Sequence, residues 1–224
     1  MTSSFQRARR PEQMAARRTS ILGAARAMLG EKSVGDISLR ELSDRVGLAK
    51  SNVLRYFDSR EAIFLEVLDE EFTMWLGDIE DRLGRPRVRK PGYDNEIRVA
   101  TVIADSVLAR PLLGELLGSM ASVLERNISH EFARDFKARA MARIAALAEL
   151  VGRHLPWLPA EFTGFFAEGS LMLTAGAYPF SVPTEPVRAA IEEIGLPDPT
   201  QRFGEGLRMG LQMWLIGAAA QTKA

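Results

Sequence analysis

Between Lys50 and Phe57 the chain carries a row of side chains suited to nucleic acid, KSNVLRYF. Val53 and Phe57 stand four positions apart and mark the inner face of a short helix, so their polar neighbours face outward. Those neighbours are Lys50, Ser51, Asn52, Arg55 and Tyr56, and none is acidic. Lys and Arg can pair with phosphate or guanine, Asn can bond adenine, and Ser and Tyr hydroxyls reach phosphate oxygens. The pattern favours a DNA-contacting helix over a basic face that is merely solvated.

A second helix has to precede this one and hold it in place. Leu39, Leu42 and Val46 recur at steps of three and four, and Ser38 with Glu41 forms a capping box, which predicts a helix from about Ser38 to Arg45. Gly47 permits the positive φ that ends such a helix. The corner is sharp because so few residues separate the two helices. The spacing therefore predicts a helix-turn-helix.

Taken with Phe57-Asp58-Ser59-Arg60-Glu61, the stretch resembles the DNA-binding domain of the TetR family of bacterial transcriptional regulators. In that family a Thr/Ser-initiated second helix is followed by Gly-Val-Ser-Lys, an aromatic-rich recognition helix and a Phe-x-Ser-Lys-Glu start of the fourth helix. The matching residues here are Ser38, Gly47-Leu48-Ala49-Lys50, Val53-Leu54-Arg55-Tyr56-Phe57 and Ser59-Arg60-Glu61. Ala49 replaces the usual hydroxyl cap, and Leu54 with Arg55 stands where the family commonly has two aromatics.

The resemblance implies roles for individual residues. Tyr56 and Arg60 lie at positions where the family grips the DNA backbone. Arg55 has the reach for a base edge, while Leu54 can touch a thymine methyl without hydrogen-bonding a base. The candidate DNA-binding residues are Ser38, Arg40, Lys50, Ser51, Asn52, Leu54, Arg55, Tyr56 and Arg60.

Charge is unevenly distributed along the 224 residues. Residues 1 to 60 hold 12 Lys or Arg against 6 Asp or Glu, a balance of +6, and the remainder holds 17 against 23, a balance of −6. The first quarter is therefore expected to face phosphate. The chain has no cysteine, which excludes disulfides and thiolate metal sites, and no apolar run of eighteen residues. We expect a cytoplasmic protein that makes no membrane contact.

Helical periodicity predicts an all-α chain with two domains. A first helix is expected from about Glu12 to Gly30, behind a basic arm, Met1 to Pro11, that is disordered until it binds. Such an arm can enter the minor groove or simply remain solvated. Ser59 caps a fourth helix of about 25 residues. We expect a three-helix DNA-binding domain over residues 12–75 and a helical effector-binding and dimerisation bundle over 76–224.

Catalytic chemistry has little support in the sequence. His130 and His154 lack the spacing of helical metal ligands, and no nucleophile motif occurs. Gly204, Gly206 and Gly210 follow no strand, so they cannot form a nucleotide cradle. The acidic residues of the fourth helix are flanked by Arg82 and Arg85, which favours an ion-paired face over a metal site. We expect no catalytic residue, metal or cofactor.

The last helices carry glycines at roughly helical-turn steps, where another helix can approach closely: Gly169, Gly176, Gly206, Gly210 and Gly217. We interpret them as a homodimer face, with packing inside one subunit as the alternative. The resemblance implies the same arrangement, because the last two long helices form the dimer interface in relatives. It also implies an effector pocket beside the fourth helix, and the many Met and aromatic residues near Trp75 predict an apolar or aromatic effector.

These features together predict a dimeric repressor that recognises a palindromic operator and is released by a small molecule. Effector binding would reposition the fourth helix and so change the separation of the two recognition helices. A ligand-independent architectural DNA-binding protein is the first alternative. An α-helical enzyme is the second, and it lacks an evident site.

Overall fold

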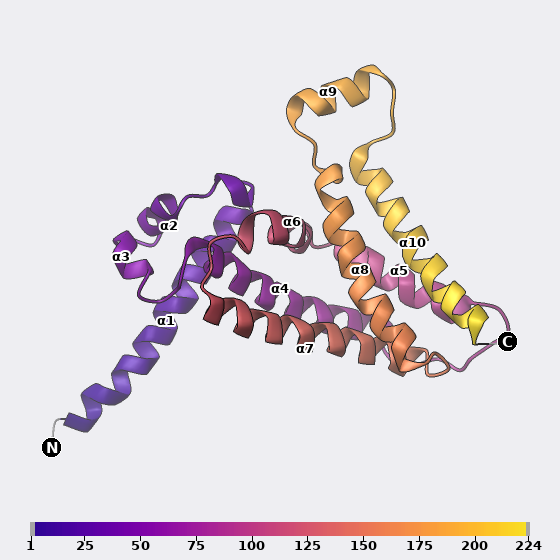
Figure 1. Cartoon of the computed structure of the whole chain (residues 1–224), viewed down its shortest axis with the longest axis horizontal. Helices are drawn as coiled ribbons and strands as arrows, with labels where there is room; N and C mark the ends of the chain where they lie inside the picture. The colour runs from indigo at the N-terminus through magenta and orange to yellow at the C-terminus, as the bar shows by residue number, and fades with distance from the viewer. Residues whose placement is uncertain (1–2, 223–224) are drawn as a thin grey trace. The chain divides into compact units, whose positions relative to one another are not determined.

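The computed structural model describes residues 3–222, with side chains from Pro11 onward. Over these residues the chain is helical and contains no strand, which confirms the predicted all-α class (Figure 1). The helices are α1 (Ser3–Leu29), the 3-10 helix η1 (Val34–Asp36), α2 (Leu39–Arg45), α3 (Lys50–Val53), α4 (Arg60–Leu83), α5 (Asp94–Leu108), α6 (Pro111–Ser119), the π-helical turn η2 (Met120–Leu124), α7 (His130–His154), α8 (Ala160–Ser181), α9 (Glu185–Glu193) and α10 (Pro199–Gln221).

The chain forms two compact units. The first contains the residues up to Glu70 together with Ser119–Lys137, and the second contains Glu71–Gly118 together with the residues from Ala138 on. Helices α4 and α7 both begin in the first unit and end in the second. The segment Ser119–Lys137 thus belongs to the first unit although it lies far from the rest of that unit in sequence, and the periodicity did not indicate this.

The core of the first unit is mainly apolar, with Ser43 and Glu61 as buried polar residues. Ile21 and Ala25 of α1 are buried with Leu42 of α2 and with Val34 and Ile37, the two residues expected to plug this core from the connecting loop. Burial of these side chains holds the short helices together, because neither α2 nor α3 is long enough to be stable alone.

Helix α1 begins earlier than the sequence predicted. It starts at Ser3 and contains Pro11, so the prediction of a disordered arm before Glu12 was wrong for the described residues, while Met1 and Thr2 lie outside them. Arg, Ala, Gln and Met are strong helix formers. Their summed preference outweighs the backbone hydrogen bond that Pro11 cannot donate.

In the second unit, buried contacts attach α4 to α5. The Trp75 side chain is fully buried, and its Nε1 donates a hydrogen bond to Ser106 Oγ at 2.7 Å. Its ring packs edge to face against Phe72, with 5.1 Å between the ring centres. On the outer side, Asp78 pairs with Arg82 at 3.0 Å, as expected for an ion-paired face. Trp75 is therefore a core residue of this unit.

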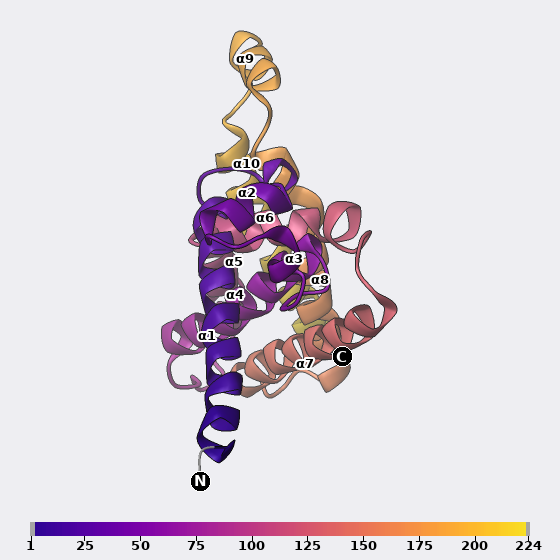
Figure 2. The same cartoon turned by 90° about the vertical axis from the view of Figure 1, so that its left-hand side faces the viewer.

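Helix α10 packs against α5 and α8. Helix α9 stands apart from them: Figures 1 and 2 show it on two connecting segments beyond the ends of α8 and α10, and it buries no residue. None of the described helices is by itself long and apolar enough to cross a membrane. Only α5 taken with α6 and η2 reaches that length and composition, and these are bent by 85°.

Candidate nucleic-acid interface

The turn between α2 and α3 has the predicted geometry. Ser38 and Glu41 form the complete capping box at the start of α2. At its end Gly47 adopts φ +67°, its N–H donates to Asp44, and the Leu48 N–H donates to the Ser43 carbonyl at 2.9 Å. This is the hydrogen-bond pattern of a Schellman motif, which satisfies the last carbonyls of α2 and reverses the chain sharply.

Helix α3 is short. Its regular part ends at Val53, and turns continue through Tyr56. Ala49 provides no side-chain cap, as the sequence predicted. Val53 and Phe57 are buried, which confirms their inward orientation. The polar residues between them consequently lie on the outside of the unit.

Two cations on this outer side are free. Lys50 and Arg55 are exposed and, among the described residues, neither forms a hydrogen bond or ion pair. Ser51, Asn52 and Leu54 are exposed beside them. A cation that already has a carboxylate partner must give up that partner to bind phosphate. Lys50 and Arg55 carry no such cost.

Most other cations of the first unit are engaged. Arg45 makes two hydrogen bonds to Glu31, at 2.6 and 3.2 Å, and Lys32 donates to Glu41 at 2.8 Å. Arg40 Nε lies 3.9 Å from Asp44 Oδ2, which is too far for a hydrogen bond, and its side chain is highly exposed. Arg40 is therefore available to bind phosphate. Ser38 is exposed, but its hydroxyl serves the capping box.

Arg60 is held inside its own unit. Its Nη1 donates to the Ile37 carbonyl at 2.6 Å, its Nε donates to Glu61 at 2.9 Å, and its guanidinium lies 5.7 Å from the Phe64 ring centre. The family resemblance predicted that Arg60 contacts a DNA phosphate. In the structure the same side chain ties the start of α4 to the segment that precedes α2.

Arg18 is a residue that sequence reasoning missed. Its guanidinium donates to the Tyr56 carbonyl and to Glu66 and lies 4.2 Å from the centre of the Phe57 ring. It thereby joins α1 and α4 to the end of the segment Lys50–Tyr56, which comprises α3 and the turns after it and which we call the recognition segment. A signal was present: Arg18 precedes Ile21 by three positions and so shares the inward face of α1.

Asp58 makes a second unpredicted connection within the first unit. Its Oδ2 accepts a hydrogen bond from the Ser129 N–H at 2.7 Å, and this bond lowers the pKa of the carboxyl. Ser129 Oγ in turn accepts from the Phe132 N–H at 3.2 Å and caps α7. The loop after α3 is thus attached to the start of α7.

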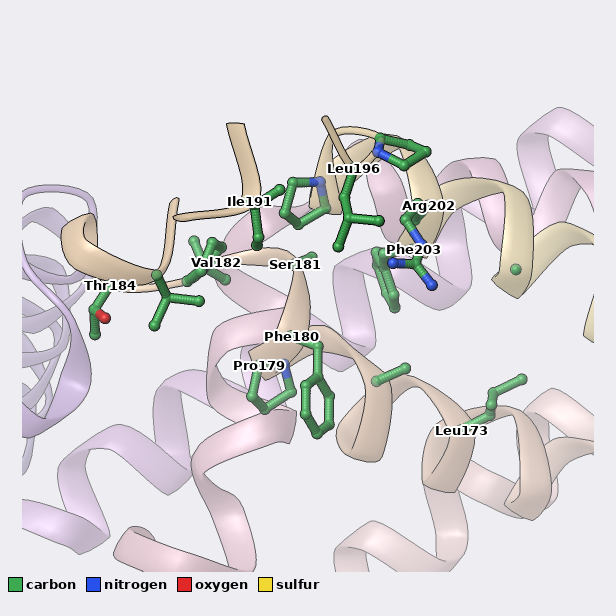
Figure 3. A pocket seen from close by; sticks show the side chains of 16 residues that line it. Leu173, Pro179, Phe180, Ser181, Val182, Thr184, Ile191, Leu196, Arg202 and Phe203 are labelled. Atoms are coloured by element: carbon green, nitrogen blue, oxygen red, sulfur yellow. The ribbon is translucent and has the colours of Figure 1, made fainter. Parts of the chain in front are cut away.

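An apolar hollow of about 740 Å³ lies in the second unit between α9 and the adjoining ends of α8 and α10 (Figure 3). Its walls include Leu173, Phe180, Ile191 and Phe203, and Arg202 is the charged member among its described lining residues. Its volume falls within the usual range of small-molecule sites. The sequence placed the effector pocket beside the fourth helix, so this hollow was not anticipated.

The paired helices α8 and α10 expose an apolar surface that we call the α8–α10 face. It comprises Phe165, Met172, Met209, Met213 and Trp214, whose side chains are 38 to 69% exposed. Isolated exposed apolar residues are ordinary, but a cluster of this kind on adjacent helices marks an interaction surface.

The glycines of these helices separate into two groups. A Cβ at Gly169 would meet Trp214 at 2.7 Å, and one at Gly210 would meet Leu173 at 3.2 Å. At these two positions the close approach occurs inside one subunit, which was the alternative interpretation. Cβ atoms at Gly176, Gly206 and Gly217 would meet nothing within 4 Å.

His154 lies in surroundings that do not suit a metal. His154 is buried, its Nδ1 is 3.4 Å from an Arg98 nitrogen, and burial followed by the positive charge of Arg98 lowers its pKa. Within residues 3–222 no three His, Asp or Glu side chains form a group that could hold a metal ion.

Both parts of the chain match known protein families. A family described as "Bacterial regulatory proteins, tetR family" matches residues 21–67, and one described as "Tetracyclin repressor-like, C-terminal domain" matches residues 69–222. The HTH-type transcriptional regulator RutR of Escherichia coli (strain K12) is 28% identical over 72 residues, which are 32% of this chain and 34% of RutR. The chain thus spans about a third of the length of the curated relatives it matches.

Two solved structures are similar to the chain at low sequence identity, and the first of them shares its fold. The transcriptional regulator FadR from Bacillus subtilis, solved in complex with stearoyl-CoA, has a TM-score of 0.53 and 11% identity, covering 89% of this chain and 98% of that one. The TetR family repressor AlkX from Dietzia sp. has a TM-score of 0.49 and 19% identity, covering 90% and 96%.

The capping box of α2 should make stability depend on pH. The hydrogen bond from Lys32, reinforced by those from Ser38, lowers the pKa of Glu41 from 4.5 to about 2. A depressed carboxyl pKa contributes stability above pH 4.5 and loses it as the pH falls toward 2. We expect Glu41→Gln, which keeps the reach to the Ser38 N–H without titrating, to show a smaller loss between pH 5 and pH 2.5.

Denaturant unfolding of both proteins at a series of pH values measures this difference. Other carboxyls, including Asp58, titrate in both proteins, so only the difference between the two curves is assigned to Glu41. Parallel curves would show that Glu41 carries no pH-dependent stability.

Proposed function

The chain belongs to the TetR family, whose members are DNA-binding transcriptional regulators and not enzymes, and from this we propose that it is a dimeric repressor released from its operator by a small apolar or aromatic ligand. The observation that carries the proposal is the free pair of cations, Lys50 and Arg55, on an outward face directly after a helix-turn-helix corner. Such a regulator acts in the cytoplasm, where it meets its operator.

We divide the DNA contacts by chemistry. Arg55, Asn52 and Lys50 carry the donors that base edges accept, and Leu54 offers apolar contact to a thymine methyl. Arg40, Ser51 and Tyr56 serve the phosphate backbone, and Ser38 contributes by capping the start of α2. Arg60 contributes by positioning the start of α4, because its donors are already bound to Ile37 and Glu61. We assign DNA binding to residues 12–75 and effector binding and dimerisation to 76–224, although Glu71–Trp75 belong to the second compact unit and Ser119–Lys137 to the first.

The α8–α10 face serves as the dimer interface. A two-fold regulator needs a self-complementary surface away from its recognition helices, and burial of the same apolar patch on both subunits supplies it. Gly206 and Gly217, which have open space above them, allow a partner helix to approach closely. Two-fold symmetry in turn implies a palindromic operator.

The effector binds in the hollow between α8, α9 and α10. Its apolar walls favour a ligand without many polar groups, and α8 and α10 also carry the proposed dimer face. A ligand there would change how the two subunits meet. The continuous helix α4, held to α5 by the Trp75 hydrogen bond to Ser106, carries the change toward the recognition helices.

Replacing Arg55 tests whether this residue recognises the base sequence of the operator. We expect Arg55→Ala to lose about 1 to 3 kcal/mol of binding free energy and to relax base preference at one operator position, because a guanidinium can make two bonds to guanine. Binding is measured on a duplex selected by the protein from a random library, on its single-base variants and on random DNA. Arg45→Ala is the control, since Arg45 is bound to Glu31. Unchanged base preference in Arg55→Ala would make Arg55 a phosphate contact.

Replacing Met213 tests the dimer. We expect Met213→Glu to dissociate the protein into folded monomers, because it would bury an unpaired charge in the α8–α10 face. Met141→Glu is the matched control: Met141 is 57% exposed on α7, outside that face. Sedimentation velocity and circular dichroism distinguish dissociation from unfolding. Met213 is preferred to Gly210, since a side chain at Gly210 would disturb packing against Leu173 within the subunit. A dimeric Met213→Glu protein would remove this face from the proposal.

Replacing Ile191 tests the effector site. Apolar and aromatic compounds are screened for two coupled effects, a rise in melting temperature and a fall in operator affinity. We expect Ile191→Asp to abolish both, because it places a charge in the hollow. Ile194→Asp, at the residue that directly follows α9 and is not among the lining residues, should preserve both effects. A ligand that stabilises the protein without changing DNA affinity would contradict allosteric release and favour the ligand-independent architectural alternative.

A further inference from the structure

A second surface of the first unit lies beside the recognition segment. We call it the α1–α3 groove. Gln13, Arg17 and Ser20 line it from α1, where their spacing of four and three residues places them on one helical face, and Arg55 with Tyr56 lines it from the turn after α3. Met14 and Ala16 complete the described lining.

The two neighbouring arginines of α1 differ in their surroundings. Arg18 points inward and binds the Tyr56 carbonyl and Glu66. Arg17 is exposed and, among the described residues, has no hydrogen bond or ion pair. Successive residues of a helix point about 100° apart, so Arg17 lines the groove while Arg18 turns toward Tyr56 and Glu66.

The lining chemistry selects the class of ligand. The groove holds two free guanidinium groups, from Arg17 and Arg55, and no carboxylate among its described lining residues. Gln13, Ser20 and Tyr56 add neutral hydrogen-bonding groups. Guanidinium groups match phosphate oxygens in geometry and charge. An open groove with these two free guanidinium groups and no carboxylate among its described lining residues suits a phosphodiester chain.

We propose that the α1–α3 groove binds the DNA phosphate backbone and that Arg17 is a phosphate clamp, which rests on the proposed DNA-binding function. Arg55 lies at the boundary between the groove and the recognition face, so a strand held by Arg17 passes next to the bases read from α3. The Arg18 contacts hold the two walls together, which limits the reorganisation that binding requires. The clamp fixes the register of the protein on the duplex without reading sequence.

The test measures how binding depends on salt. Each phosphate contact made by a cation changes the slope of log affinity against log salt by about one, so loss of Arg17 from both subunits should reduce the slope by about two per dimer. We expect Arg17→Ala to weaken binding to the selected duplex and to a random duplex by a similar factor and to preserve base preference. Arg17→Lys should restore most of the slope, and Arg17→Gln should not.

Arg26→Ala is the matched control, because Arg26 lies on the same helix and is bound to Glu70 at 2.8 Å. It should keep the wild-type slope, and melting temperatures should confirm that all variants are folded. A scan of duplexes carrying single uncharged methylphosphonates provides the sharper measurement. At the phosphate that Arg17 contacts, the modification should weaken the wild-type protein and leave Arg17→Ala unaffected.

The outcomes are distinguishable. If the wild-type protein binds the selected duplex with a steep salt slope and Arg17→Ala keeps that slope, the clamp is refuted and the proposed function stands. If no phosphate in the scan distinguishes the two proteins, the clamp is likewise refuted. If the wild-type protein selects no duplex and binds random DNA without salt dependence, the proposed function itself fails.

Discussion

The recognition segment depends on the contacts of Arg18. Helix α3 has four residues, and isolated helices shorter than about 12 residues are marginal in water. Its geometry therefore has to be imposed from outside. Arg18 binds the Tyr56 carbonyl at the end of the segment, stacks on the Phe57 ring and pairs with Glu66 of α4. Val53 and Phe57 are buried beneath the segment, so its polar side chains face outward.

The division of the cations into paired and free groups follows from the same arrangement. Arg45, Lys32, Arg26 and Arg60 each have an acceptor in the first unit and hold its loops and helices in place. Arg17, Lys50 and Arg55 have none among the described residues, and all three lie at or beside the recognition segment. These three cations of residues 1 to 60 therefore lie where phosphate can bind them, which raw charge counts cannot show.

Chain continuity and a few hydrogen bonds anchor the two helices that run through both units. Helices α4 and α7 each run from the first unit into the second. Asp58 ties the loop after α3 to the capped start of α7, and Trp75 ties α4 to α5. Helices α4 and α7 are thus two covalently continuous connections from the second unit to the two sides of the loop that follows α3.

The sequence by itself determined the helical class, the capping box at Ser38, the left-handed Gly47 and the inward Val53 and Phe57, because each depends on neighbours within about four residues. It identified Lys50, Arg55 and their neighbours as outward for the same reason. Only the tertiary structure decided which cations are free. Arg17 and Arg18 are neighbours of the same residue type, and Arg55 and Arg60 also share one type, yet Arg17 and Arg55 have no partner among the described residues while Arg18 and Arg60 are bound. Their partners, among them Glu66, Tyr56 and Ile37, are brought close by folding over 23 to 48 positions of the chain, and no local pattern encodes that proximity.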